Sequence, residues 1–571
     1  MSRLLLFISL FFSFQLVNSA ILKVPSTYPT IQSALDSCAQ GDTVLVSPGT
    51  YRESIRWPRT QGLKLIGEKG RDSTVVVNTG NDRVITIQYS FSPQIRLDTT
   101  TIISGFTISN RIFQGDTAIG GGIKIYENDV KLVNLIIKNN YLDYQVCWGA
   151  GILFRESNSI MIDCIVKKNT IDAELRAFGS GIHLYEGVLQ MRDCKIDSNY
   201  NYGRNWAYGA GLYAINRSSI IAQNSTFNSN YIDSAIWSNG AGIYLDHSNA
   251  ILTNCEVSYN TVRFGAWTHG TGIHSGGWSF PISDSLILRN VKILGNVANK
   301  SSSYDGVGLY LSETKCNFEN VLIAENLMGS VDSRGGKGIG IYYERRDTSM
   351  VSIFDHLTVT NNLKSDSTLT YGTGLFFKGG KLEITNSIFH NSGVGIEIYH
   401  PKYIYGNDSV KVSHSNIRGG YSGIGNIDVN SSFVSASDYS LLDSSKCAGA
   451  GILIQRVVDD IDGNPRPLPS NTNPDMGCYE INQRATGLFS FSEQNQHILI
   501  YPNPVKRGDR VYIKANSINN VVLFDSKGKD FNVDLKGINF ETAHFSTSHL
   551  KRGIYFLRLN TQVIKKIVVT D

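Results

Sequence analysis

The 571-residue sequence has few of the signals that mark a helical, membrane-spanning or metal-binding protein. Its apolar residues show no period of 3.6, which excludes a mainly helical fold. Beyond the N-terminus no run is long and apolar enough to cross a bilayer, so we expect a protein that is not membrane-spanning. The eight cysteines include no Cys-x-x-Cys spacing and no zinc motif follows them, so we expect no metal site and no cofactor.

The N-terminal segment is the one exception to this lack of apolar runs. Arg3 precedes an apolar stretch over residues 4–17, and the small residues Ser19 and Ala20 follow it. The stretch is too short to span a membrane and ends in a cleavable site. We therefore expect residues 1–20 to be a secretory signal peptide.

Positive charge is also scarce in most of the chain. Residues 498–571 hold 12 Lys+Arg against 6 Asp+Glu, and once these and Arg3 are removed from the net +4, the rest carries −3. The part of the chain before residue 498 therefore lacks the excess of positive charge that nucleic-acid binding requires, and we expect no nucleic-acid partner. The net charge does not favour the binding of a polyanion to this part of the chain either, although a local cluster of basic residues is an alternative that the net charge does not test.

A repeat dominates what is present. The pattern Gly-x-Gly-(Ile/Leu) occurs ten times, with the second glycine spaced by 29–36 residues and by 21 at the last step. A fixed period in this range predicts a solenoid, in which each unit buries its apolar face against its neighbours. The second glycines are Gly122, Gly151, Gly181, Gly211, Gly242, Gly272, Gly308, Gly340, Gly374 and Gly395.

A second motif in each unit predicts two interior rows. It closes on an asparagine, from Asn140 to Asn361, and stacked asparagine amides can hydrogen-bond along the axis. Near its start lie Cys164, Cys194 and Cys255, whose parallel side chains suit stacking better than disulfides. We expect these three thiols to be buried and unpaired, and Cys447 and Cys478 to be the better candidates for a disulfide.

Short strands, glycine corners and an asparagine ladder resemble the right-handed parallel β-helix of the pectate lyase superfamily. The opening segment over residues 24–51 resembles that family's cap, in which Thr30 begins a short helix that plugs the core. Residues 459–466 and 475–480 resemble the closing segment of secreted bacterial β-helix proteins. The resemblance implies an all-β fold of about 10–12 coils over residues 21–481, and it is weak for activity.

The C-terminal part has a different character. After a linker at residues 482–497, residues 498–571 carry a Tyr-Pro-Asn-Pro start, an Asp-x-x-Gly-Lys turn and a Gly-Ile-Tyr-Phe strand. These motifs resemble the C-terminal sorting domain of the type IX secretion system. The resemblance implies a small immunoglobulin-like β-sandwich, the secretion machinery as partner, and a place on or outside the surface of a Gram-negative, Bacteroidota-type cell.

An aromatic row is the candidate ligand site. In each glycine-bearing strand the second residue after the glycines is expected to point outward, and tryptophans lie in the connections just before it. Such rings, repeated every ~4.8 Å, suit an extended polysaccharide. Loops that cover the row as a satellite core are the alternative. The candidate ligand-binding residues are His183, Trp206, Tyr213, Trp237, Tyr244, Trp267, His274, Tyr310 and Tyr342.

Catalysis has less support in the sequence. The candidates are His183, Glu186, Asp246, His274 and Glu344, but Asp246 and Glu344 lie three coils, or ~14 Å, apart, too far for a glycosidase pair. We therefore expect polysaccharide binding without catalysis. The alternatives are a polysaccharide lyase, which would need Ca²⁺, or a glycoside hydrolase, and next a structural surface protein or adhesin. Two carboxylates with a Lys, Arg or His in one groove patch would favour the enzyme.

Overall fold

The computed structural model describes most of the chain, which divides into two compact units, Met1–Gln483 and Arg484–Asp571. The expected signal peptide, except for Ser19 and Ala20, and the expected linker at 482–497 lie outside the described residues. Those are 19–78, 80, 82–88, 96–110, 118–277, 284–329, 336–365, 370–392, 395–401, 408–481, 499–514, 518, 521–525, 529–536, 542–559 and 563–571.

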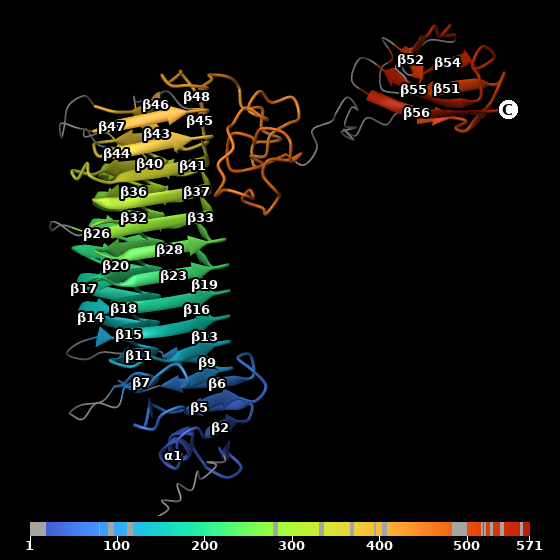
Figure 1. Ribbon diagram of the computed structural model, residues 1–571. Helices are drawn as coiled ribbons and strands as arrows, with labels where there is room; N and C mark the ends of the chain where they lie inside the picture. The colour runs from blue at the N-terminus through green and yellow to red at the C-terminus, as the bar shows by residue number, and fades with distance from the viewer. Residues whose placement is uncertain are drawn as a thin grey trace, which may run out of the picture. The chain divides into compact units, whose positions relative to one another are not determined.

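The first unit is a right-handed parallel β-helix of about 11 turns (Figure 1). Its strands form one continuous sheet system in which every described pairing is parallel and joins one turn to the next. Strand β15 (Ile152–Ile162), for example, pairs with β11 (Ile123–Tyr126) on one side and with β18 (Ile182–Arg192) on the other. The predicted solenoid and its number of coils are confirmed.

Two strands of each coil, one on either side of the glycines, matter for the site. The strands before the glycines are β14 (Tyr141–Trp148), β17 (Thr170–Phe178), β21 (Trp206–Tyr208), β26 (Ala235–Asn239), β31 (Gly265–His269) and β35 (Ser301–Asp305). Those after them are β11, β15, β18, β22 (Leu212–Ile215), β27 (Ile243–Asp246), β32 (Ile273–Ser275), β36 (Leu309–Ser312) and β40 (Ile341–Glu344), while β43 (Thr370–Phe377) contains its own glycines.

The glycines are required at this corner for two different reasons. The first glycine is left-handed, with φ of +57° at Gly209 for instance, a conformation that side chains disfavour. The second has no room for a side chain: a Cβ at Gly211 would lie 2.5 Å from the carbonyl oxygen of Gly242 and 2.8 Å from the Asn230 amide. The repeat thus records a sharp turn and a close approach between coils.

The asparagine ladder forms as predicted, with one change of register. Asn140 Nδ2 donates to Asn169 Oδ1 at 2.7 Å, and the same bond recurs between successive coils. At the far end the ladder continues through Asn362, which accepts from Asn326 at 2.8 Å, and not through Asn361. Asn361 takes the left-handed corner (φ 51°) and donates to Tyr439 Oη, because His356, not Asp355, starts the motif there.

The N-terminal cap also agrees with the sequence. Helix α1 (Ile31–Asp36) begins at Thr30, whose side chain accepts a hydrogen bond from the Ser33 backbone. Its buried face joins the main core beside β1 (Ile21–Val24) and β2 (Thr43–Val46). The short helix therefore covers apolar residues that no preceding coil is present to cover.

Of the two predictions about cysteines, one is confirmed and the other is wrong. Cys164, Cys194 and Cys255 are buried free thiols, as expected. Cys447 and Cys478 are also free, so the expected disulfide does not form. The reason is their packing, since Cys447 lies in a cluster with Ile388 and Met476, whereas Cys478 lies in a separate one with Leu322.

The closing segment runs beside the last coils instead of capping their end (Figure 1). The backbone carbonyl of Asp459 accepts from Asn320 Nδ2 at 2.8 Å, and that of Ile452 accepts from Asn386 Nδ2 at 2.7 Å. Cys478 N donates to Thr358 Oγ1 at 3.0 Å. The segment therefore covers the side of several coils and satisfies polar groups at their corners.

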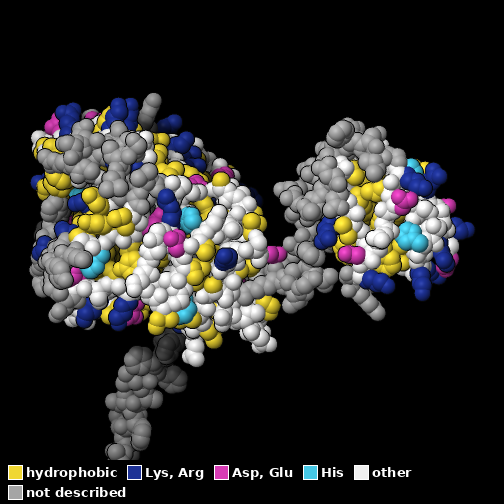
Figure 2. Space-filling model, turned by 90° about the horizontal axis from the view of Figure 1, so that it is seen from above, with side chains coloured by type: hydrophobic (Ala, Val, Ile, Leu, Met, Phe, Trp, Pro, Cys, Tyr) yellow, Lys and Arg dark blue, Asp and Glu magenta, His cyan; other side chains and the backbone are white. Residues whose placement is uncertain are grey.

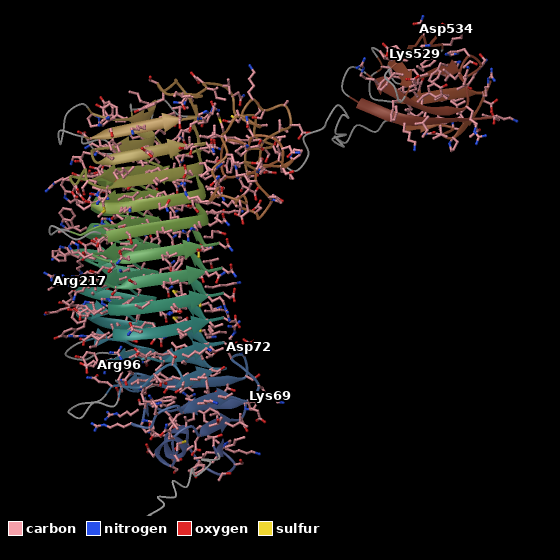
Figure 3. All side chains as sticks on the ribbon, viewed as in Figure 1. Lys69, Asp72, Arg96, Arg217, Lys529 and Asp534 are labelled. Atoms are coloured by element: carbon pink, nitrogen blue, oxygen red, sulfur yellow. The ribbon has the colours of Figure 1, made fainter. Side chains whose placement is uncertain are left out.

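Charged side chains lie mostly outside. Lys69, Asp72 and Arg217 are exposed at the corners of the solenoid (Figure 3). Seen along the axis, Lys and Arg side chains are spread around the rim, with acidic ones among them (Figure 2). No helix of the described residues is long and apolar enough to cross a membrane.

The second unit has two sheets that share one apolar core, with Val511 and Ile513 from one and Leu557 and Ile567 from the other. The immunoglobulin-like subtype stays a prediction. One sheet contains β49 (Leu499–Tyr501), β51 (Arg510–Lys514) and β54 (Thr542–Ser546), and the other β50 (Val505–Lys506), β56 (Val563–Thr570), β55 (Gly553–Leu559), β52 (Val521–Asp525) and β53 (Asp530–Phe531).

Candidate functional site

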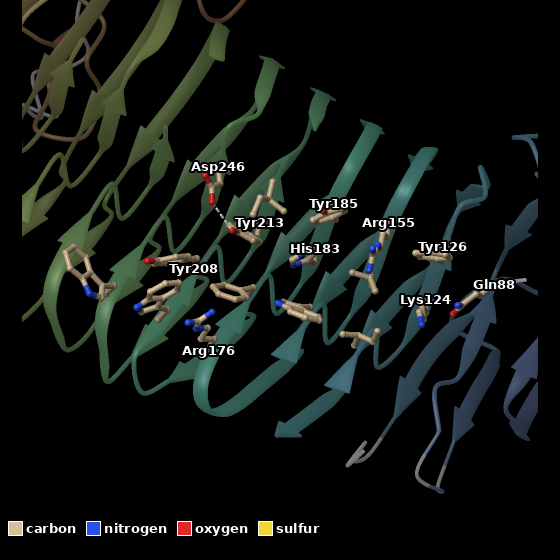
Figure 4. A pocket seen from close by; sticks show the side chains of 17 residues that line it. Gln88, Lys124, Tyr126, Arg155, Arg176, His183, Tyr185, Tyr208, Tyr213 and Asp246 are labelled. Carbon is tan, nitrogen blue, oxygen red and sulfur yellow. Dashed lines mark hydrogen bonds between the residues drawn. The ribbon is translucent and has the colours of Figure 1, made fainter. Parts of the chain in front are cut away.

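A groove of about 800 Å³ follows the glycine corner of the solenoid (Figure 4). The strands before and after the glycines form its two walls, and the residues next to the corner form its floor. It crosses successive coils, so side chains far apart in the sequence line one surface. They are Gln88, Ile119, Lys124, Tyr126, Trp148, Leu153, Arg155, Arg176, Phe178, His183, Tyr185, Trp206, Tyr208, Tyr213, Ile215, Trp237 and Asp246.

The floor is the expected outward row, and parallel register brings its members together. Tyr213 pairs with His183 on one side and with Tyr244 on the other. Beyond the groove the rings stack face to face, with centroids 4.3 Å apart for Tyr244 and His274 and 4.8 Å apart for Tyr310 and Tyr342. The strand spacing of ~4.8 Å is close to the distance at which rings stack.

This stacking changes the expected role of the row. Because the faces of most rings contact other rings, only their edges can meet a ligand. Tyr244 is 0% exposed, covered in part by Tyr208 at 4.7 Å, and so cannot contact a ligand. For Tyr244 the covered-core alternative is therefore correct, whereas His183 and Tyr213 line the groove with little exposed surface.

One wall presents the tryptophans. Trp206, Trp237 and Trp267 occupy equivalent positions in three successive coils, paired directly in register. Trp237 stacks on Trp267 with centroids 5.4 Å apart, and Trp206 is 37% exposed. These rings, more than the floor, offer apolar surface to a ligand.

Three cations line the groove, Lys124 and Arg155 toward one end and Arg176 farther along, beside Tyr208 (Figure 4). Lys124 lies on the floor. Arg155 lies on the opposite wall from the tryptophans, with its guanidinium 5.1 Å from the Tyr126 ring centroid and 5.0 Å from that of Tyr185. Arg176 lies on the tryptophan wall, 4.1 Å from the Trp206 centroid. Aromatic rings therefore hold both guanidinium groups in place.

Burial shapes the protonation of the groove. Lys124 has its pKa lowered to about 8 by burial and by neighbouring Arg83 and Arg155. Burial lowers the pKa of His183 to about 3, so its imidazole is neutral at pH 7. At the other end, burial raises the pKa of Asp246, whose Oδ2 accepts from Tyr213 Oη at 3.1 Å.

The catalytic candidates do not meet at one place. His183 and Asp246 line the groove, His274 and Glu344 line a second cavity, and Glu186 lines neither. Glu186 takes an exposed left-handed corner and hydrogen-bonds Asn216. The described residues contain no group of three or more His, Cys, Asp or Glu that could hold a metal ion.

The second cavity, of about 180 Å³, gathers acidic groups. It is lined by His269, His274, Gly276, Gly277, Tyr310, Ser312, Glu313, Glu344 and Arg346. Glu344 Oε1 lies 2.7 Å from Lys378 Nζ and its Oε2 accepts from Tyr342 Oη at 3.1 Å. Behind His269 lies Asp305, at 3.9 Å, and burial raises its pKa to about 6.

The sequence patterns did not identify several residues of these sites as candidates. Arg155 occupies the fourth position after its second glycine, as do Tyr126, Tyr185 and Asp246 in other coils. Alignment of this fourth position across the repeats would identify the wall, just as alignment of the second position identifies the floor row. Arg176 and Asp305 belong to the strands before the glycines, where loop lengths vary and the register is harder to read.

Comparison with known families finds a right-handed β-helix region at residues 68–209 and a secretion system C-terminal sorting domain at residues 499–570. The type IX sorting domain implies secretion or cell-surface localisation in a Bacteroidota-type bacterium. No match was found among curated proteins.

Two solved structures are similar to this chain. The catalytic unit of a thermostable GH87 α-1,3-glucanase from Streptomyces thermodiastaticus strain HF3-3 is 14% identical, with 73% of this chain and 70% of that one covered and a TM-score of 0.38. Pectate lyase Pel9A is 13% identical, with 81% and 97% covered and a TM-score of 0.29.

Proposed function

For this secreted or cell-surface β-helix joined to a type IX sorting domain, we propose the binding of an extended polysaccharide, without catalysis, in the groove at the glycine corner. The observation that carries the proposal is the groove itself, which runs across successive coils and combines an open tryptophan wall with fixed polar groups. Sugars bind proteins through such a combination, since ring surfaces pack on their C–H groups and polar side chains fix their orientation.

The wall residues carry more of the proposed contact than the floor. Trp206 and Trp237 offer surface to a ligand, whereas His183 and Tyr213 offer edges. His274, Tyr310 and Tyr342 lie outside this groove and support its floor through their stacking. Trp267 has a supporting role behind Trp237.

A glycan array probed with the full-length protein tests the proposal, followed by titration of any bound polymer. Trp206→Ala and Trp237→Ala should each weaken binding several-fold and leave the melting temperature nearly unchanged. Tyr259→Ala is the matched control, because Tyr259 is 55% exposed at a corner outside the groove. Unchanged affinity in both tryptophan variants, or the absence of any bound polymer, would overturn the proposal.

A carbohydrate-active enzyme is the second candidate, and one observation favours it. The second cavity holds Glu313 and Glu344 with His269 and Arg346, so that carboxylates and a histidine able to transfer protons lie beside a guanidinium able to bind an anion. Asp305, with its pKa of about 6, could hold a proton near pH 6. Reducing-end and unsaturated-uronate assays on any bound polymer test this. Product formation that Glu344→Gln abolishes would favour the enzyme over the binding protein.

A further inference from the structure

We infer that the Lys124 end of the groove binds an acidic group of the glycan, a carboxylate or a sulfate ester, so that the ligand is an anionic polysaccharide. The inference rests on the proposed glycan binding and adds the chemical class of the ligand. It goes against the net charge of the solenoid, and therefore depends on the local arrangement of cations.

The first observation is a buried cation that has no counter-ion among the described residues. Lys124 is 9% exposed and lines the groove. Burial and the charges of Arg83 and Arg155 all lower its pKa, and no carboxylate of the described part of the chain raises it. A buried ammonium group is costly without a paired anion. An acidic ligand group would supply that partner.

The second observation is an unused hydrogen-bonding atom on the same floor. His183 is 4% exposed, and its Nδ1 has no hydrogen-bond partner. Buried polar atoms in proteins are nearly always paired, so an unpaired one that lines a groove points to a ligand. The one proton of the neutral imidazole is engaged by the backbone of Phe178, so the other ring nitrogen can accept a hydrogen bond from a sugar hydroxyl beside the acidic group.

The third observation is that a second cation, Arg155, faces this end from one wall, while Arg176 lies farther along the other wall. Arg155 is held between Tyr126 and Tyr185, and Arg176 lies on Trp206. Arg155 Nε is 3.5 Å from Glu156, and no hydrogen bond to a described residue occupies its two terminal nitrogens. Guanidinium groups bind carboxylate and sulfate oxygens through paired N–H donors.

Positive and negative side chains are also separated along the length of the groove. The cations lie in the coils of Gly122, Gly151 and Gly181, whereas Asp246 lies in the coil of Gly242. An acidic sugar would therefore be favoured at the first end and disfavoured near Asp246. The arrangement selects a polymer with a spaced or terminal acidic group and gives it a direction.

The test compares polymers that differ only in charge. The full-length protein is titrated with polygalacturonate and its methyl ester, and with dextran sulfate and dextran, and tryptophan fluorescence is followed. We expect at least one charged polymer to bind about 10-fold more tightly than its neutral form, and the pair that shows this distinguishes carboxylate from sulfate. Lys124→Met should reduce the ratio about 10-fold.

Lys195→Met is the control, since Lys195 is an exposed lysine on β19 (Lys195–Asp197), outside the groove. Equal affinity for charged and neutral polymers would overturn the inference and leave the glycan-binding proposal intact. An equal loss in the Lys195 and Lys124 variants would also overturn it, because binding would then follow net charge. Binding of none of the four polymers would count against both the inference and the proposed function.

Discussion

Lys124→Met should make the protein more stable while it weakens the proposed binding of an acidic glycan. The folded protein lowers the pKa of Lys124 from 10.5 to about 8, which corresponds to a cost of about 3 kcal/mol for holding the charge at pH 7. Water in the groove screens part of this cost. We expect the substitution to raise the free energy of unfolding by about 1–3 kcal/mol at pH 7.

The pH dependence gives the sharper form of this prediction. Between pH 8 and pH 10.5 the unfolded state binds more protons at Lys124 than the folded state does. The free energy of unfolding of the wild type should therefore rise with pH across this window, relative to the Met variant. Below pH 8 the difference between the two proteins should be constant, and by pH 10.5 it should be nearly gone.

Urea unfolding followed by tryptophan fluorescence measures this difference in the full-length protein. All six tryptophans lie between residues 57 and 278, so the signal reports on the solenoid alone. Lys195→Met should change the free energy of unfolding by less than about 0.5 kcal/mol, as exposed substitutions usually do. A Lys124→Met protein that is less stable at pH 7, or whose gain persists unchanged at pH 10.5, would refute the reasoning.

Three further predictions concern the solenoid and its export. Asn230→Ala leaves the ladder donors of Asn199 without their acceptor and should cost several kcal/mol, at about 1–3 for each orphaned group, in urea unfolding; a cost below 1 would contradict the ladder's role. Cys164, Cys194 and Cys255 should resist thiol reagents until denaturant is added, and native labelling would show that the row is accessible. Deletion of residues 498–571 should leave the β-helix folded in the periplasm, and its arrival at the cell surface of the native host would contradict the sorting role.

The repeat predicted the fold well because glycine and asparagine are used where little else fits. Gly211 has no space for a Cβ, and Asn230 must both donate and accept within the ladder, so these positions show in the sequence. The floor row could be read for the same reason, since register carries equivalent residues to one line. The shift from Asn361 to Asn362 was missed because Asn occupies both positions of that corner.

What the sequence could not predict depends on side-chain packing and on chain segments without a repeat. Periodicity places Tyr244 in the floor row but does not say that Tyr208 and His274 cover its two faces. The Cys447–Cys478 pairing failed because both cysteines lie in residues 418–481, which contain no strand of the solenoid sheet, so no period fixes which residues meet. The residues of the sites were partly predictable, because they occupy repeated positions but differ in residue type from coil to coil.

Because the groove is built coil by coil, its length is set by the number of coils. Each coil adds one floor residue and one or more residues to each wall, with the same turn and the same ladder bond. Removal of residues 212–242 would join Gly211 directly to Ile243, the residue that pairs in register with Leu212, and bring the next coil into the place of the one lost. Duplication or loss of single coils could thus lengthen or shorten the binding surface by steps of ~4.8 Å without redesign of the core. Such a surface can follow changes in the length of a polymeric ligand by changes in copy number alone.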